Sequence, residues 1–490
     1  MANPLPSHWA NFRWESTYAR LPNLLHKRQE PTPVPEPKLV ILNEPLAVEL
    51  GVDITALASP EGAAVLAGNI AIEGLEPLAQ AYAGHQFGHF TVLGDGRAIL
   101  LGEHRTPSGK LVDVQWKGAG PTEFSRRGDG RLALGPALRE FIVSEALAAL
   151  GIPTTRSLAV VATGESVMRE ESLPGAVLTR IASSHVRVGT FQFAFITRDE
   201  DAFKSLVAFC MARHYPELGN SLSPENVIHF FAKVVQRQAD LVAKWLSVGF
   251  VHGVMNTDNT TISGEAIDFG PCAFLDTYDP NAVFSSIDRG ARYAFAQQPG
   301  IVGWNLARLG DTLIPLMGKT SEAGEAAANA MMETFNETFG ASLSKAFGPK
   351  LGIAKPRPED MALLDELLTI AAKEKMDFNN LWLSLTDLGP DSAAIPPAIG
   401  DWSKKWAVRL RDEGTSAADA KLRMQKVNPV VILRNHRVEH ALARATEGDL
   451  APFYQLLAAV RDPFHDSKAA RELGAAPAQP NPNYQTFCGT

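Results

Sequence analysis

The chain has 490 residues, of which 45% are hydrophobic and 20% are charged, and its formal net charge is −8. This length suits one large core or roughly two or three lobes. An acidic balance gives no footprint of a nucleic-acid-binding protein, so we expect no nucleic-acid partner. The cysteines, Cys210, Cys272 and Cys488, are too few for a disulfide scaffold and lack the spacing of a zinc site.

The sequence also predicts where the protein works. Its uncharged apolar runs stay below the roughly 18–20 residues that a membrane helix requires. The N-terminal stretch MANPLPSHWANFRWES lacks a basic segment followed by an apolar core, which a secretion signal has. We therefore expect a cytoplasmic protein without a membrane partner.

The N-terminal residues carry no catalytic pattern and include the Pro-rich stretch PTPVPEPKLVI. We interpret residues 1–75 as an extended segment that ends in short helices. The next stretch, FTVLGDGRAILLGEHR, has two apolar runs around the turn 94–96. A Gly- and Asp-rich turn between apolar runs predicts a β-hairpin.

A strand and a helix follow. LVDVQWKGAG alternates as a strand does, with Val112, Val114 and Trp116 on one face and Lys117 at its end. GPALREFIVSEALAALGIP is typical of a helix, with a proline near its start and Gly and Pro at its end. RSLAVVAT and GAVLTRIAS predict two further strands, so we expect a β-rich lobe with one prominent helix.

The rest of the chain is predicted to be mostly helical. SPENVIHFFAKVVQRQADLVAKWLSVGF has a capping Ser223, a terminating Gly249 and an apolar stripe at helical spacing. GWNLARLGDTLIPLM and DLAPFYQLLAAV predict two more helices. We expect an α+β fold with four parts: the N-terminal segment, a β-rich lobe at 76–215, a helical lobe at 216–465, and a C-terminal tail at 466–490.

A candidate metal site lies in the stretch FVHGVMNTDNTTISGEAIDFGPC. Kinase-like catalytic loops combine an aspartate base, a metal-binding asparagine and a D-F-G on the next strand. Here Asn259 and the D-F-G aspartate Asp268 are present, but the position of the base holds Val254. A lone D-F-G is usually a surface turn, whereas H-G-x(5)-N-x(8)-D-F-G favours two oxygen ligands for a hard cation such as Mg²⁺.

Lys117 and Glu140 form a second candidate pair. In kinases a strand lysine holds the nucleotide phosphates and a helical glutamate orients it. An exposed lysine and an exposed glutamate are the commoner fate of both residue types, so the pair depends on the metal pattern for support. Glu145, on the same predicted helix, is the alternative partner.

Glycine turns and a histidine pair complete the candidates. Gly94 and Gly96 would let backbone amides approach an anion, although a plain hairpin turn has the same composition. A second turn, 128–130, follows a basic stretch and has no counterpart in kinases. His85 and His89 lack an evident third metal ligand, which favours a packed or hydrogen-bonded pair over a metal site.

Together these motifs resemble the selenoprotein O family (SelO, YdiU in bacteria). The resemblance rests on YAGHQFGHF, LGDGRA, QWKGAGPTEFSRRGDGR, HGVMNTDN, IDFGPCAF and the terminal FCGT, and it runs from about residue 80 to the C-terminus. It implies a protein-kinase-like two-lobed fold without the usual base. It also implies transfer of AMP from ATP to Ser, Thr or Tyr hydroxyls of proteins, or of UMP from UTP.

The resemblance also implies roles for individual residues. Asp258 takes the place of the family's proton acceptor, and the sequence does not separate this role from metal coordination. Asn259 and Asp268 take the places of ligands to Mg²⁺ or Mn²⁺. The implied nucleotide contacts are Gly94, Gly96, Arg97, Lys117, Asp129, Gly130, Arg180, Arg187 and Asp268.

The missing base agrees with the nucleotide orientation that the resemblance implies. The family binds its nucleotide turned around, with the α-phosphate at the reacting position and the β- and γ-phosphates deeper in the lobe. Arg180 and Arg187 would then hold those inner phosphates, since arginine binds phosphate in a bidentate manner and stays charged. Nucleotidyl transfer depends chiefly on positioning and charge neutralisation, so one lost base need not end activity.

The tail carries one further expectation. Cys488 stands where eukaryotic members have selenocysteine, and the resemblance implies a disulfide between Cys272 and Cys488, as in bacterial members. Two alternatives to the nucleotidyltransferase remain: a kinase that phosphorylates protein or small-molecule hydroxyls, and an inactive nucleotide-binding scaffold. Val254 argues against the first, and the retained phosphate and metal ligands argue against the second.

Overall fold

A nine-stranded sheet organises the N-terminal part of the protein. The computed structural model describes residues 4–219, 221–479, 481 and 483–486. The sheet has the order β2-β4-β7-β8-β11-β10-β3, with β1 added to β7 and β9 to β11, and every pairing is antiparallel. Its strands are β1 (Trp14–Glu15), β2 (His26–Arg28), β3 (Lys38–Leu42), β4 (Leu78–Gln80), β7 (Ala98–Arg105), β8 (Leu111–Lys117), β9 (Leu132–Ala133), β10 (Arg156–Met168) and β11 (Ser172–Ala182).

The two faces of the sheet bury different cores. Val114 and Trp116 of β8 pack with the short helices α1 (Glu44–Leu50), α2 (Ile54–Ala58) and α3 (Pro60–Leu66). The opposite face packs on α4 (Leu134–Ala149) and joins the core of the helical part. The predicted face of β8 and the predicted short helices are therefore confirmed. The N-terminal segment also supplies strands β1 to β3, which the sequence had not indicated.

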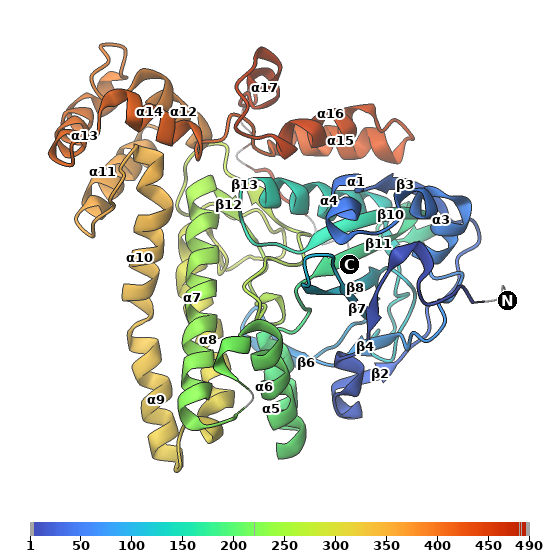
Figure 1. Ribbon diagram of the computed structural model, residues 1–490. Coiled ribbons are helices and arrows are strands. Elements are labelled where there is room, and N and C mark those ends of the chain that lie inside the picture. The colour runs from blue at the N-terminus through green and yellow to red at the C-terminus, as the bar shows by residue number, and fades with distance from the viewer. Residues whose placement is uncertain (1–3, 220, 480, 482, 487–490) are drawn as a thin grey trace.

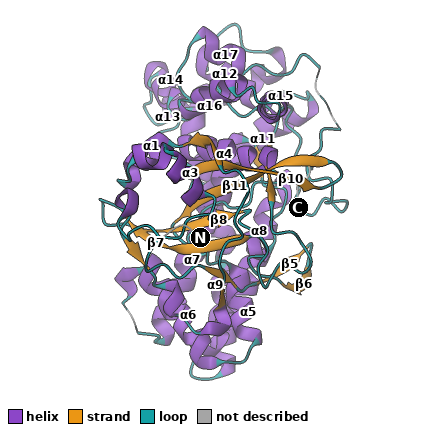
Figure 2. Ribbon diagram, turned by 90° about the vertical axis from the view of Figure 1, so that its right-hand side faces the viewer, coloured by secondary structure: helices purple, strands orange, loops and turns teal. Residues whose placement is uncertain are grey.

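The predicted hairpin around residues 94–96 is wrong. Strand β6 (His89–Val92) pairs with β5 (Ala83–Gln86), in a separate two-stranded sheet that Figure 2 places away from the main sheet. Strand β7 instead pairs with β8, because a tight turn between them brings the Lys110 carbonyl to the Thr106 amide at 2.8 Å. The stretch 93–97 thus connects the small hairpin to the large sheet.

Helix α7 (Pro224–Val248) is the central helix of the second part and follows its predicted signals. Ser223 caps it by accepting a hydrogen bond from the Asn226 amide, and Gly249 ends it in the left-handed region at φ 74°. The predicted apolar stripe is buried. Figure 1 shows α7 beside α8 and α10, with α5 and α6 near its lower end.

Two helices, α5 (Val188–Ile196) and α6 (Glu200–His214), were not predicted and lie within residues 76–215, where one prominent helix was expected. The helices after α7 are α8 (Gln298–Met317), α9 (Ser321–Glu333), α10 (Phe335–Phe347), α11 (Asp360–Lys373), α12 (Phe378–Leu388), α13 (Gly400–Asp412), α14 (Ala417–Gln425), α15 (Asn435–Thr446), α16 (Ala451–Arg461) and α17 (Lys468–Leu473). The helices from α8 to α16 confirm the predicted helical character of residues 216–465, and α17 lies in the predicted tail. None of the helices within the described ranges has the length and apolar character needed to cross a membrane.

Candidate functional site

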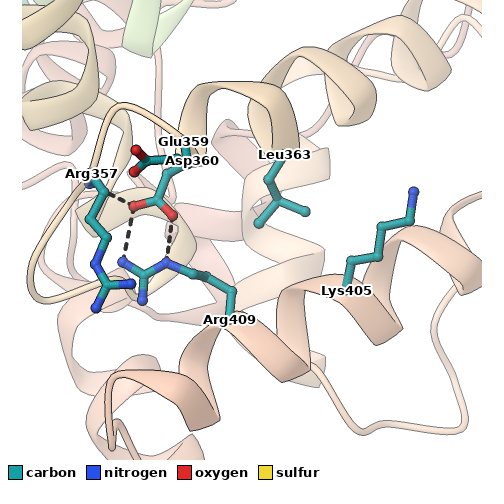
Figure 3. Close-up of a pocket in the computed structure, with 6 residues that line it drawn as sticks. All are labelled: Arg357, Glu359, Asp360, Leu363, Lys405 and Arg409. Carbon is teal, nitrogen blue, oxygen red and sulfur yellow. Dashed lines mark hydrogen bonds and ion pairs between the residues drawn. The ribbon is translucent and has the colours of Figure 1, made fainter.

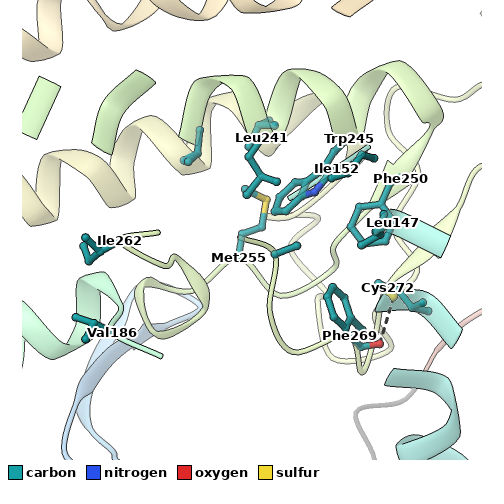
Figure 4. Close-up of a cluster of buried hydrophobic side chains, with 14 of the residues drawn as sticks. Leu147, Ile152, Val186, Leu241, Trp245, Phe250, Met255, Ile262, Phe269 and Cys272 are labelled. Atoms are coloured by element: carbon teal, nitrogen blue, oxygen red, sulfur yellow. Dashed lines mark hydrogen bonds between the residues drawn. The ribbon is translucent and has the colours of Figure 1, made fainter. Parts of the chain in front are cut away.

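The site forms where the end of β8 meets the segment between β12 (Phe250–Val251) and β13 (Ala273–Phe274). These two short strands pair antiparallel, so the chain between them leaves and returns at one place. Apolar side chains anchor this segment in the core: Figure 4 shows Met255, Ile262 and Phe269 in a cluster with side chains of α7. The polar residues between the anchors are therefore held against the sheet.

Asp268 is the centre of the site. Lys117 Nζ and Arg180 Nη1 lie 2.6 Å and 2.8 Å from its Oδ1. Arg187 Nη1 lies 3.6 Å from its Oδ2. Asp268 has φ 63°, a conformation that non-glycine residues rarely adopt and that is common at functional sites. Three cations from the sheet and the following loop thus converge on one carboxylate.

Glu140 is the second carboxylate of this cluster. Its Oε2 lies 2.6 Å from Lys117 Nζ, and its Oε1 accepts a hydrogen bond from Arg180 at 3.2 Å. Glu145 instead pairs with Arg156 and Arg461. Of the two alternatives that the sequence left open, Glu140 is the partner of Lys117.

The electrostatics of the site follow from burial and from these cations. Burial alone would raise the pKa of Asp268, but Lys117, Arg180 and Arg187 outweigh it and hold that pKa well below its usual range. Burial raises the pKa of Asp95 to about 6 and that of Asp258 also to about 6, with Arg187 acting against both shifts. Asp268 is therefore the permanently ionised group.

The two arginines are fixed in place by further contacts. Arg180 donates to Gln115 Oε1 from Nη2 at 2.6 Å, and Arg187 donates to the carbonyl of Asp258 at 3.1 Å. The guanidinium carbon of Arg187 also lies 4.4 Å from the centre of the Tyr82 ring. Both side chains are 2% exposed, so their positive charges act in a poorly solvated environment.

Asn259 and Val254 explain how the segment keeps its shape without an aspartate base. The Asn259 amide group donates to the Val254 carbonyl at 2.9 Å, which closes the loop and leaves the Asn259 side-chain oxygen available. Val254 is itself buried, at 9% exposure. In the sequence pattern, Val254 stands where kinases have the aspartate base, five residues before Asn259.

Asp258 lies beneath the β5–β6 hairpin. Its Oδ1 is buried and has no hydrogen-bond partner among the described residues. A Cβ on Gly84 would lie 2.1 Å from that oxygen, so only glycine allows the hairpin to approach so closely. Buried carboxylate oxygens are rarely left unpaired, which points to a missing partner at this position.

The oxygen donors here suit a hard divalent cation. Asp258 Oδ1, the Asn259 side-chain oxygen and Asp268 Oδ2 come from one short stretch of chain, and oxygen ligands are those that Mg²⁺ and Mn²⁺ prefer. A cluster of three or more His, Cys, Asp or Glu side chains is absent from the described part of the chain. An Asn and two Asp, completed by water or phosphate, would therefore form the shell.

The glycine turns lie against a covering loop. Phe124 packs on Gly94, where a Cβ would lie 2.4 Å from its ring, and the Thr122 hydroxyl donates to the Asp95 carbonyl at 2.6 Å. The Arg97 carbonyl accepts from the Gly118 amide at 2.7 Å. A side chain at position 94 would thus collide with Phe124, so packing alone already requires glycine there.

The second turn has its own constraints. Gly130 has φ 66°, and a Cβ there would lie 2.1 Å from the backbone of Gly120. Asp129 pairs with Arg169 at 2.8 Å near the surface. Its pKa is lowered by this hydrogen bond.

The structure thus brings Lys117, Glu140, Arg180, Arg187 and Asp268 into direct contact, and it places Asp129 in a different ion pair.

Three polar groups of the site were missed in the sequence. Gln115 links Arg180 to Asp95, because its Nε2 donates to Asp95 Oδ2 at 3.2 Å. Gln115 stands two positions before Lys117 on the same face of β8, so strand alternation could have identified it. Tyr82 and the Asp95 carboxylate had no comparable signal, since only the tertiary fold brings them to Arg187.

The expected packed or hydrogen-bonded state is found not for the exposed His89 but for His85. Its ring lies 3.2 Å from Gln192 Nε2 and packs edge-on against Trp304 with ring centres 5.0 Å apart. His89 lies opposite Gln86 in the hairpin and is exposed.

Cys272 is buried, and its thiol donates to the Phe269 carbonyl at 3.2 Å (Figure 4). Its expected partner, Cys488, lies outside the described residues.

Comparison with known proteins identifies the family of the chain. A family model described as protein adenylyltransferase SelO matches residues 8–461. A relative from Bradyrhizobium diazoefficiens, named protein nucleotidyltransferase YdiU, is 50% identical over 98% of this chain and 99% of its own length. Relatives with the same name from Geobacillus kaustophilus and Bacillus cytotoxicus are 49% and 50% identical over 98% of this chain, and the matches cover 100% and 98% of their own lengths.

The class and the family follow from these matches together. A mixed helix and sheet protein with this cation–carboxylate centre, matched along nearly its whole length, is an enzyme of the transferase class. The chain belongs to the SelO family of protein adenylyltransferases.

The buried state of Asp95 predicts a pH-dependent effect on stability. Folding raises its pKa from 3.8 to about 6, so the group favours the folded state at low pH and loses this contribution as the pH rises through about 6. Asp95→Asn removes the cost of an ionised buried carboxylate. We expect the variant to gain about 1–2 kcal/mol of unfolding free energy over the wild type between pH 5 and pH 8.

Chemical denaturation at several pH values measures this effect. Asp391→Asn serves as the control, because its side chain is 71% exposed and its pair with Arg411 spans 3.6 Å. An Asp95→Asn stability difference that stays constant with pH would show that the buried carboxylate does not titrate as described.

Proposed function

We propose that the protein transfers AMP from ATP to Ser, Thr or Tyr hydroxyls of protein substrates and releases pyrophosphate. The observation that carries this proposal is the combination of two arginines with Lys117 on Asp268, beside a buried valine at the position of the kinase base. An enzyme that transfers the terminal phosphate would need the base and not the additional inner cations.

The proposal includes a kinase-like arrangement of two lobes. Residues 76–215 would form the nucleotide-holding lobe, with the Lys117–Glu140 pair between sheet and helix, and residues 216–465 would form the helical lobe. The 1–75 and 466–490 segments would be additions to that core. The antiparallel sheet and the order of lysine, glutamate, asparagine and D-F-G along the chain support this arrangement.

The nucleotide would enter with its β- and γ-phosphates toward the sheet. Lys117, Arg180 and Arg187 are held on Asp268 in the structure, and phosphate oxygens are ligands for the same donors. Phosphates that take over these cations would free Asp268 Oδ1 and Oδ2 for a metal ion. The α-phosphate would then lie at the outer end of the site, where the acceptor hydroxyl arrives. The glycine turns with Arg97 and Asp129 would contribute the remaining nucleotide contacts.

Asn259, Asp268 and Asp258 would hold Mg²⁺ or Mn²⁺. A divalent cation bound there would supply neutralisation of the phosphate charge. The fit rests on the unpaired Oδ1 of Asp258 and on the fixed amide group of Asn259. The same Oδ1 is also suited to accept a proton, so Asp258 serves the reaction as a ligand or as the base.

In the proposed chemical step one bond forms, one bond breaks and one proton is transferred. The oxygen of the acceptor hydroxyl forms a bond to the α-phosphorus, and the bond from that phosphorus to the bridging oxygen of the β-phosphate breaks. Pyrophosphate leaves with that oxygen, and the hydroxyl proton passes to Asp258. A base contributes about 10²–10⁴-fold to such reactions, so the fixed cations would account for the larger share.

Isotope transfer tests the reaction. With ATP labelled at the α-phosphate we expect protein-bound label, self-modification included, and with γ-labelled ATP we expect none. Asp268→Ala should abolish the transfer, and Lys117→Ala should reduce it by about 10²-fold or more, since each removes a group from the charge centre. Label from the γ-position alone would indicate the alternative, a kinase, and label from neither would indicate a scaffold. UTP labelled at the α-phosphate tests UMP transfer in the same assay.

Nucleotide affinity tests the reversed orientation. Arg187→Lys keeps the charge but loses the two-pronged hydrogen bonding of the guanidinium group. We expect ATP to bind about tenfold more weakly and AMP to bind as in the wild type, because AMP lacks the inner phosphates. Calorimetric titration measures both. Arg28→Met, on an exposed residue paired with Glu76, is the control, and an equal loss for AMP would place Arg187 at the wrong end of the nucleotide.

We further propose that Cys272 and Cys488 form a disulfide that ties the tail to the D-F-G segment. Thr486 donates to the Pro271 carbonyl at 2.7 Å, which brings the tail next to Cys272. Burial raises the pKa of the Cys272 thiol to about 12, so the reduced thiol would react slowly. Alkylation followed by mass measurement should show reductant-dependent labelling of both cysteines. Full alkylation without reductant, after purification under oxidising conditions, would exclude the disulfide.

A further inference from the structure

A pocket lies between helices α7 and α10, next to the segment that carries Asn259 and Asp268. Its volume is about 330 Å³, near the lower end of the range for small-molecule sites. Arg237, Asp240 and Lys244 line it from one face of α7, and Ser342 and Lys345 line it from α10. The turn containing Ser263, between Asn259 and Asp268, closes one side.

The charges of this pocket are not balanced. Three cations and one carboxylate line it, and Asp240 already accepts a hydrogen bond from the Ser342 hydroxyl at 2.7 Å. Arg237 donates to the carbonyls of Ser263 and His214, and Lys244 donates to the carbonyl of Gly151. Backbone carbonyls orient these cations without neutralising them. The pKa of Lys244 is lowered, first by burial and further by Lys345, while Asp240 acts in the opposite direction.

The excess positive charge of this pocket distinguishes it from another pocket of the protein. The pocket of about 300 Å³ between α11 and α13 is also lined by basic residues (Figure 3). There Arg409 pairs with Asp360 and Glu413, and Lys405 pairs with Glu366. Two carboxylates, Glu359 and Asp360, line that pocket beside its three cations, so it has less excess positive charge to attract an anion.

We propose that the pocket between α7 and α10 binds a small anion that carries a phosphate group. Arg237 is preorganised for this role, since its guanidinium carbon also lies 4.2 Å from the centre of the Tyr215 ring. Lys244 and Lys345 supply the charges on the two helices. The Ser342 hydroxyl already donates to Asp240 and accepts from Gln236, so it is not counted among the donors to the anion.

The position of the pocket connects the anion to the catalytic segment. The Ser263 carbonyl contacts Arg237, and the neighbouring Thr261 carbonyl accepts from Gln238 of α7 at 2.6 Å. Thr261 also pairs with Arg187 as an isolated β-bridge. An anion that draws Arg237 would therefore act on the turn that joins Asn259 to Asp268 and on the backbone of Arg187.

Hydrogen–deuterium exchange of the full chain tests the proposal, with inorganic phosphate, pyrophosphate and AMP as probes. We expect protection of peptides that cover 237–244, 261–264 and 342–346. Protection by phosphate and pyrophosphate alone would define a site for inorganic anions, and stronger protection by AMP would define one for nucleoside monophosphates. Protection confined to peptides around Lys117 and Asp268, or absent everywhere, would overturn the proposal.

Two variants with opposite expected effects keep the test independent of folding. Lys345→Met, on an exposed position of α10, should raise the Kd of the protecting anion at least about tenfold. Asp240→Asn keeps an acceptor for Ser342 and removes the carboxylate, so it should lower that Kd several-fold. Lys233→Met, on α7 and paired with Glu217, is the matched control. Equal Kd values for all three variants would overturn the proposal.

Discussion

The ion pairs of Asp268 with three cations are the interactions on which the rest of the site depends. A carboxylate largely withdrawn from water is costly unless cations and hydrogen bonds compensate it, and the Asp268 side chain, which is 25% exposed, receives Lys117, Arg180 and Arg187. Two of these cations belong to neighbouring strands of the sheet, and Asp268 belongs to the segment packed on α7. The carboxylate therefore links the sheet to the helical part and fixes their relative position.

The same arrangement determines how charge is distributed through the sheet. Gln115 accepts from Arg180 and donates to Asp95, so a neutral amide separates a guanidinium group from a second buried carboxylate. Burial raises the pKa of Asp95 to about 6, so this carboxylate becomes ionised as the pH rises through that value. The charges of Lys117, Arg180 and Arg187 therefore face those of Asp268, Glu140 and, above about pH 6, Asp95.

Local sequence signals were sufficient for much of the fold and for part of the site. Strand alternation gave the faces of β8, capping residues gave the ends of α7, and spacing gave the pairing of Lys117 with the helical glutamate. The prediction of a hairpin at 94–96 failed because each of the two strands pairs with its other neighbour along the chain, β6 with β5 and β7 with β8. Tyr82 and Asp95 could not be identified from the sequence, because their contacts with Arg187 exist only in the tertiary fold.

Val254 shows how this loop keeps its shape without an acidic side chain at position 254. The Asn259 amide group donates to the Val254 carbonyl, a backbone group that does not depend on the side chain at this position. The Val254 side chain is itself buried, so a carboxylate at this position would have to be desolvated. Asp258, under the glycine-allowed approach of the hairpin, offers an unpaired oxygen a few residues further along. In the proposed reaction the α-phosphate would therefore lie near Asp258 rather than near Val254, with the β- and γ-phosphates toward Lys117, Arg180 and Arg187.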